Sequence, residues 1–223
     1  MEWKKTTEIV DSVLPGETVL VEYTTSYTPE FLLRFFADYT SERGISLIID
    51  DNFDALHKII THARSIGLTI DLNTANIYVL KTGGKFDVGN VVARVPFDPD
   101  SRIYLRNYAE ASAGVLQEIQ YPAINLVLGL EELFLFMDNT LDAHQMVIRM
   151  QKFIGNKKRK AFYIVNKEAM ESLPIKVLGE LERISTTVMR LTPYHTGLSI
   201  KALKSMNPRL IGIETVIDVG RWD

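Results

Sequence analysis

The sequence contains no cysteine. This absence excludes disulfide bonds, thiolate nucleophiles and metal sites built on cysteine, and it is compatible with a cytoplasmic protein. A basic excess is missing as well, since the formal net charge is -3. The chain as a whole therefore has no general electrostatic attraction for nucleic acid or for anionic lipid.

Long apolar runs are also missing. The longest, Ala123 to Leu130 and Leu133 to Met137, are far shorter than the roughly 20 residues that a membrane-spanning helix needs. The first five residues, Met1 to Lys5, do not open an apolar secretory signal. With 46% apolar and 24% charged residues, the chain has an ordinary globular composition. We therefore expect a single α/β domain over residues 1–223 that is cytoplasmic and does not enter a membrane.

One segment, from Thr18 to Arg43, is the centre of the predicted fold. An apolar strand containing Val19 to Val21 leads into a polar turn, and a strongly apolar helix follows. Thr28 is suited to cap that helix and Pro29 to occupy its first position. In α/β proteins this junction, at the carboxyl end of the first strand, is where phosphates usually bind.

Strands and helices alternate along most of the remaining chain. The apolar patterns predict strands at 17–23, 45–49, 76–80, 123–130, 161–165, 184–191, 198–204 and 211–219, with a strand and a loop within 88–99. They predict helices at 4–13, 29–43, 53–66, 101–120 and 142–154, and a further helix before residue 183 that Pro174 interrupts. This order predicts three layers: a mostly parallel sheet with helices on both faces and an antiparallel hairpin at the C-terminus.

The order resembles that of the RecA-like ATPases, and within them the compact archaeal KaiC/RadA-like domains. Val13 to Leu20 is similar to the approach to their P-loop strand, and Leu126 to Gly129 to their Walker B strand. Ile48 to Asp51 is similar to their second strand, which carries the acid that activates water, and Leu198 to Ile213 to their late hairpin. Across residues 8–219 the chain resembles a small archaeal family of such domains that lacks intact Walker motifs. The resemblance implies a three-layer RecA-like fold and an oligomer.

The nucleotide-binding motifs of these ATPases are not intact here. A P-loop uses glycines to wrap phosphates with backbone N–H groups, a lysine to neutralise them and a hydroxyl to hold Mg²⁺. The equivalent turn has no glycine and no lysine; it consists of Tyr23, Thr24, Thr25, Ser26, Tyr27 and Thr28. At the Walker B position the aspartate is replaced by Gly129, and Glu131 is the first acid after it. The leading interpretation is a pseudo-ATPase without a cofactor, which acts through a protein partner or through self-assembly.

Two alternatives remain open. Asp50 and Asp51 are the candidate catalytic residues of a nucleotide hydrolase with an atypical phosphate site, in which Thr28 would lie near Mg²⁺ and ATP would be the ligand. As helix-capping acids they need no catalytic role. The basic run Lys157 to Lys160 could contact nucleic acid, although the acidic chain and the lack of interleaved aromatic residues favour a solvated loop.

Other features have simpler explanations. Glu131 and Glu132 could supply a displaced metal ligand, but they are also ordinary first-turn acids of a short helix. Gly83 and Gly84, flanked by lysines, could form a phosphate-binding turn or a plain loop. The four histidines lack the spacing of a metal site. The apolar run Leu133 to Met137 is too dense for a one-sided helix and predicts a partly exposed interface.

Overall fold

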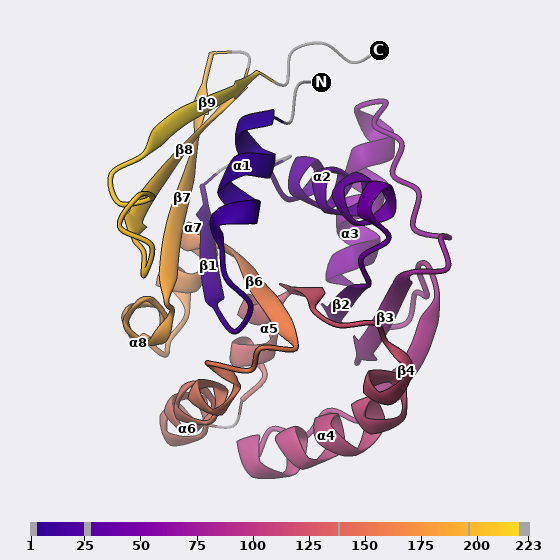
Figure 1. Ribbon diagram of the computed structural model, residues 1–223. Coiled ribbons are helices and arrows are strands. Elements are labelled where there is room, and N and C mark those ends of the chain that lie inside the picture. The colour runs from indigo at the N-terminus through magenta and orange to yellow at the C-terminus, as the bar shows by residue number, and fades with distance from the viewer. Residues whose placement is uncertain (1–3, 25–27, 138, 196, 219–223) are drawn as a thin grey trace.

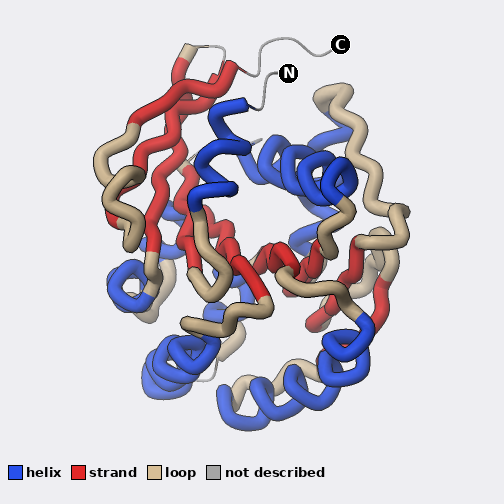
Figure 2. The backbone as a smooth tube through the Cα atoms, in the orientation of Figure 1, coloured by secondary structure: helices blue, strands red, loops and turns tan. Residues whose placement is uncertain are grey.

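The computed structural model describes residues 4–24, 28–137, 139–195 and 197–218. Its ribbon shows one large twisted sheet with helices on both faces (Figure 1). Coloured by secondary structure, the red strands run between two groups of blue helices (Figure 2). The three-layer arrangement predicted from the alternating pattern is therefore present.

The described strands form one nine-stranded sheet in the order β4-β3-β2-β5-β6-β1-β7-β8-β9. Every neighbouring pair from β4 to β7 is parallel, whereas β7 with β8 and β8 with β9 are antiparallel. The strands are β1 Thr18–Tyr23, β2 Leu47–Asn52, β3 Ile77–Thr82, β4 Val91–Val95, β5 Ala123–Leu128, β6 Arg159–Asn166, β7 Thr187–Tyr194, β8 Gly197–Lys204 and β9 Glu214–Asp218.

Two groups of helices cover the sheet (Figure 1). One face carries α1 Lys4–Ser12, α2 Thr28–Arg43 and α3 Ala55–Ser65. The other face carries α4 Ser101–Glu118, α5 Leu130–Leu135, α6 Thr140–Met150 with the 3₁₀ turn Gln151–Phe153, α7 Lys167–Ser172 and α8 Leu178–Ile184. None of the described helices is long and apolar enough to span a bilayer.

The side chains of β1 alternate between the two cores. Val19 and Val21 pack into the core under α1 to α3, and Leu20 packs into the opposite core. All three side chains are buried, as expected for a central parallel strand. Because each enclosed aliphatic side chain contributes about 1.5–3 kcal/mol, β1 is among the most firmly anchored strands.

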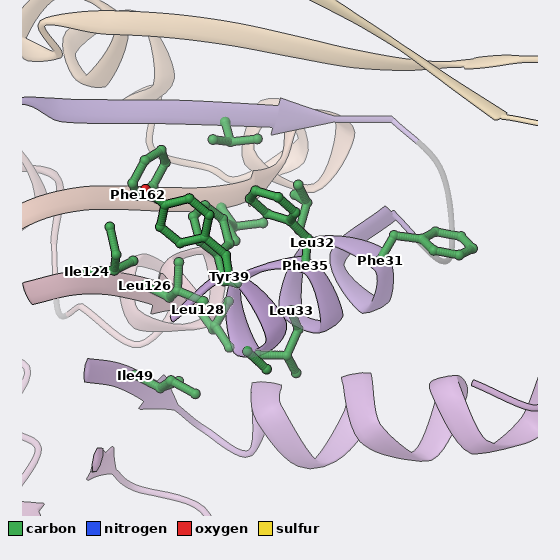
Figure 3. Packing of buried hydrophobic residues seen from close by; sticks show 14 of the residues in the cluster. Phe31, Leu32, Leu33, Phe35, Tyr39, Ile49, Ile124, Leu126, Leu128 and Phe162 are labelled. Atoms are coloured by element: carbon green, nitrogen blue, oxygen red, sulfur yellow. The ribbon is translucent and has the colours of Figure 1, made fainter. Parts of the chain in front are cut away.

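Helix α2 is apolar around most of its circumference because it is wedged between the sheet and α3. Figure 3 shows Leu33 turned toward α3, while Phe35 lies on the side of the strands near Phe162. Phe36 also contacts Phe162, with ring centroids 4.7 Å apart. Gly44, at φ 62°, ends the helix in the left-handed conformation predicted for its cap.

The sequence predicted the fold class correctly, but several boundaries were wrong. β2 continues through Asp50 and Asp51 to Asn52, because both acids are buried with polar partners inside the sheet. β5 ends at Leu128, because α5 begins at Leu130. The final strand begins at Glu214 rather than at Ile211, because a described turn precedes it.

Candidate functional site

A cavity of about 210 Å³ lies beside the carboxyl ends of β1, β5 and β6, where the sequence predicted a former phosphate site. Strand ends, the first turn of α2, one face of α3 and the start of α5 enclose it. Three of its lining side chains are carboxylates, and these are Glu30, Glu131 and Glu132. The remaining polar lining comes from Tyr23, Lys58, His62 and Asn166.

The turn predicted to correspond to a P-loop lies only partly within the described residues. Tyr23 and Thr24 follow the body of β1 and are half-buried, and Thr28 begins α2 as a buried residue. Thr25, Ser26 and Tyr27 lie outside the described residues. Burial raises the pKa of the Tyr23 hydroxyl, and the carboxylates of Glu131, Glu30 and Glu132 raise it further. Tyr23 thus shares the lining of the cavity with all three acids.

Glu30 occupies the first turn of α2, where an acid is expected to favour the positive end of the helix dipole. Its side chain is only 1% exposed. One oxygen, Oε1, lies 3.2 Å from Nδ1 of His62 on α3. The other, Oε2, is buried and has no hydrogen-bond partner within the described parts of the chain. Burial raises the pKa of this carboxyl above its ordinary value.

Gly129, the residue predicted to occupy the Walker B position, has a conformation that leaves no room for an acid. It has a φ of 69° and lies just before α5. A Cβ atom there would collide with the backbone carbonyl oxygen of Asn52 and would lie 2.8 Å from the Cβ of Ala55. The close approach of β2 to this turn therefore requires glycine.

The two acids after Gly129 lie in the first turn of α5. Glu131 accepts a hydrogen bond from the backbone N–H of Asn166, and burial raises its pKa to about 7. Glu132 forms an ion pair with Lys58 of α3. The cavity thus holds three carboxyl groups, and its lysine is already paired with one of them.

This charge pattern opposes a bound phosphate. A P-loop site presents a lysine and a ring of N–H donors to the phosphate oxygens. In contrast, two unit charges of the same sign repel by about 3 kcal/mol at a separation of about 5 Å in a partly buried site. A triphosphate placed beside Glu30 and Glu131 would meet this repulsion from each of these acids in its ionised form.

Asp50 and Asp51 lie on opposite faces of β2, so the structure does not bring their carboxylates together. Asp51 accepts from the Leu56 amide at 2.9 Å and from Lys81 Nζ at 2.9 Å. Asp50 accepts from Tyr108 at 3.0 Å and from Asn125 at 2.8 Å. Neither of the two aspartates lines the cavity of Glu30.

Asp50 belongs to a buried polar network on the other face of the sheet. Arg159 donates to Asn125 and lies 3.4 Å from the Tyr163 hydroxyl. Burial raises the pKa of Asp50, while Asn125, Tyr108 and the charge of Arg159 oppose that rise. A second cavity, of about 50 Å³, adjoins this network between α4 and α6.

The turn at Gly83 and Gly84 binds a carboxylate of the chain itself. The backbone N–H groups of Lys85 and Phe86 donate to Asp54 at 2.8–3.0 Å. Lys81 also reaches Asp54, at 2.7 Å, and is itself buried. The two glycines therefore wrap a side chain at the start of α3, and the space that a phosphate would use is filled.

The basic run is divided between surface and interior. Lys157 and Lys158 are exposed, whereas Arg159 and Lys160 belong to β6 and are partly buried. Lys160 Nζ donates to the backbone oxygen of Val10 at 3.1 Å. Two of the four cations are thus bound to the protein itself.

Three residues of the cavity, Lys58, His62 and Glu30, were not predicted as site residues. The sequence indicated their helices correctly, and Glu30 was interpreted only as a favourable first-turn acid. The signal that could have found them is the pairing of α2 with α3, which brings His62 to Glu30 across 32 residues. One chain without a tertiary contact map does not show that pairing.

Comparison with known proteins identifies the family of this chain. A family model described as "Pyrococcus protein of unknown function, DUF257" matches residues 8–216. The chain belongs to this family. No curated protein matches this DUF257 chain.

Solved structures show the fold of this DUF257 chain. It is similar to a Pyrococcus horikoshii OT3 protein, solved as Project ID PH0250, with 27% identity and a TM-score of 0.77 over 97% of this chain and 99% of that one. It is also similar to the KaiC-like protein PH0186 of the same organism, with 13% identity and a TM-score of 0.64 over 92% of this chain and 87% of that one. The fold is therefore RecA/KaiC-like.

Proposed function

We propose that this DUF257 protein is a RecA/KaiC-like pseudo-ATPase, a domain that does not hydrolyse nucleotide and that acts through a protein partner or through self-assembly. The observation that carries the proposal is the cavity at the carboxyl ends of β1, β5 and β6. Its lining contains Glu30, Glu131 and Glu132, and its lysine, Lys58, is paired with Glu132. A site with this charge repels the phosphates that a P-loop attracts.

The turn at Gly129 supports the same proposal. A Walker B aspartate holds the Mg²⁺ that accompanies the nucleotide phosphates. Here the carbonyl of Asn52 and the methyl group of Ala55 occupy the space that an aspartate side chain at position 129 would need. Loss of the acid is thus built into the backbone path between β5 and α5, and a single substitution would not restore it.

The apolar surface of α5 and α6 supports association with protein. Within the run Leu133 to Met137, Leu135 is 54% exposed and Phe136 is 51% exposed, while the other three side chains are buried. On α6, Leu141 and Ile148 are also exposed, and they are seven residues apart, which places them on one face of the helix. Exposed apolar side chains on adjoining elements favour a protein contact.

The hydrolase alternative needs an acid that is free to act as a base beside bound nucleotide. Asp51 instead caps α3 and neutralises the buried Lys81. Asp50 faces the opposite core and is held by Tyr108 and Asn125. These contacts favour structural roles for both aspartates and so support the non-catalytic proposal.

Two measurements test this proposal. Titration calorimetry with Mg-ATP and Mg-ADP is expected to give no saturable heat, and micromolar binding with turnover would contradict the pseudo-ATPase. Sedimentation velocity of the wild type, compared with a Leu141→Ser/Ile148→Ser variant, tests self-assembly through α6. A lower mass for the variant supports it, while an unchanged monomer assigns association to a different protein partner.

A further inference from the structure

We infer that the cavity between Glu30 and Glu131 binds an organic cation, namely a primary ammonium or guanidinium group carried on a short alkyl chain. This inference rests on the proposed function, because a cavity that holds this cation does not hold nucleotide phosphates. It assigns to the altered phosphate site a ligand of opposite charge.

The observation that points to a ligand is the unsatisfied oxygen of Glu30. The side chain is buried to 99% of its surface, since its exposed fraction is 1%. Oε1 contacts His62, but Oε2 is buried without a hydrogen-bond partner among the described residues. A buried carboxylate oxygen left in this state is costly, and rotation of the carboxylate toward the cavity that Glu30 lines would let an N–H donor bound there satisfy it.

A second acceptor lies in the same cavity. Glu131 uses Oε1 to accept the Asn166 amide, and no hydrogen bond to its Oε2 is formed within the described parts of the chain. Tyr23 lines the same cavity as both acids. An ammonium group has three N–H donors and a guanidinium has five, so either can bond to more than one carboxylate at once.

The rest of the lining suits the alkyl portion of such a ligand. Ala55, Ile59, Leu128 and Ile164 are apolar side chains on the cavity wall. The aromatic ring of Tyr23 adds a surface over which a cation is attracted. A long-chain cation commonly places its methylene groups on apolar surface and its charge on polar groups. The volume of about 210 Å³ is sufficient for one such side chain.

A metal ion fits this site less well. Within the described parts of the chain, no three histidine, aspartate or glutamate side chains are placed to hold a metal ion. The cations already present do not meet the need, since Lys58 pairs with Glu132 and His62 is 60% exposed. The lining therefore favours an organic cation, which binds through hydrogen bonds at longer range than metal coordination.

The same chemistry can come from two sources. A protein partner could insert a lysine or arginine side chain, which would join this cavity to the proposed association. A free alkylammonium compound could also enter. The carboxylates recognise the charged group in either case, so the probes must separate the two sources.

The experiment is a titration of the full chain by calorimetry and by thermal shift. The probes are n-butylammonium, 1,4-diaminobutane and a lysine blocked at its α-amino and carboxyl groups, with n-butanol as the neutral control. The variants are Glu30→Gln and Glu131→Gln, and Glu42→Gln is the matched control on the exposed end of α2. Mg-ATP is titrated separately, so that failure of the pseudo-ATPase proposal is seen independently.

The expected result is saturable binding of the cations, no binding of n-butanol and a loss of affinity of about tenfold or more in each cavity variant. Glu42→Gln should bind as the wild type does. Tighter binding of the blocked lysine indicates a partner side chain, and tighter binding of either amine indicates a free ligand. Absence of saturable binding for every cation, or equal binding by the wild type and by folded Glu30→Gln and Glu131→Gln, would overturn the inference.

The number of protons released when the cation binds is a second measurement. A purely structural role of Glu131 predicts no such release. Burial raises the pKa of Glu131 to about 7, so part of this group is protonated at neutral pH. A bound cation favours the ionised form and should release protons, seen as a dependence of the heat on the ionisation enthalpy of the buffer. The Glu131→Gln variant should lose the part of this dependence that comes from Glu131, and retention of all of it would contradict the assignment.

Discussion

Gly129 lies so close to Asn52 that a Cβ atom on Gly129 would collide with the Asn52 carbonyl oxygen. This contact joins the ends of β5 and β2, and it places the start of α5 against the start of α3. The first acid of this turn is Glu131, two residues farther along the chain. The contact thus leaves no room for an acidic side chain at position 129, and the carboxylates of α5 that line the cavity come from its first turn.

Restoring an acid at this position should therefore destabilise the protein. We expect Gly129→Asp to lower the free energy of unfolding by about 2–4 kcal/mol, because the side chain must displace backbone atoms at a positive φ. Urea unfolding measures the change. Gly114→Asp on α4, where an added Cβ meets open space, is the matched control and should change stability by less than about 0.5 kcal/mol. Equal stability of the two variants would show that the turn at Gly129 has room for an acid.

Lys81 should contribute strongly to the stability of the folded protein, although its side chain is charged. It is 1% exposed and lies 2.9 Å from Asp51 and 2.7 Å from Asp54. Lys81→Met should cost about 3–5 kcal/mol, because it leaves buried carboxylate uncompensated. Lys85→Met, at an exposed lysine without an ion pair in the described residues, should cost less than about 0.5 kcal/mol. Similar melting temperatures for the two variants would contradict the structural role.

Stability should fall as the pH rises through the range in which Glu131 ionises. The pKa of Glu131 is about 7 in the folded protein and 4.5 when unperturbed, so the folded state binds more protons between these values. The free energy of unfolding should therefore decrease from about pH 4.5 to pH 7, by at most about 3 kcal/mol from this group. Urea unfolding at several pH values should show a flatter profile for Glu131→Gln.

Other raised carboxyls limit how flat that profile becomes. Burial raises the pKa of Glu22 to about 7 and also raises the pKa values of Glu30 and Asp50, so these groups also favour a decrease of stability as the pH rises. Glu42→Gln should leave the wild-type profile unchanged. A wild-type profile that rises between pH 5 and pH 7, or a Glu131→Gln profile as steep as the wild type, would contradict the assignment to a buried Glu131.

The network around Asp50 should contribute to stability through its hydrogen bonds. Tyr108→Phe removes the 3.0 Å bond to Asp50 and should cost about 1–2 kcal/mol. Tyr78→Phe is the control, because no hydrogen bond of its hydroxyl is formed within the described ranges and the residue is half-buried on β3. Thermal unfolding compares the two variants. A Tyr108→Phe protein as stable as the control would show that the bond to Asp50 makes no net contribution.

The sequence predicted the central unit well, because that unit depends on local pattern. The apolar run Val19 to Val21 and the apolar helix after Pro29 are β1 and α2 of the structure. Gly44 ends α2 in the left-handed conformation that is expected of a glycine after a helix. Parallel strands enclosed on both faces have a strong apolar signal, so the order of elements and the fold class followed from it.

The candidate site was harder to predict, because its contacts join distant parts of the chain. Asp50 and Asp51 were interpreted as a strand-end pair, since two adjacent acids seldom lie inside a buried strand. Their partners, Lys81 and Asn125, follow 30 and 75 residues later, and only the sheet order brings them together. Likewise, the Asn166 amide that holds Glu131 is 35 residues away.

The decisive test of the pseudo-ATPase proposal is calorimetric titration of the wild-type chain with Mg-ATP and Mg-ADP near neutral pH. We expect no saturable heat for either nucleotide up to about 1 mM, because carboxylates line the cavity where phosphates would bind. Micromolar binding accompanied by hydrolysis, with the hydrolysis lost in a folded Asp50→Asn or Asp51→Asn variant, would contradict it.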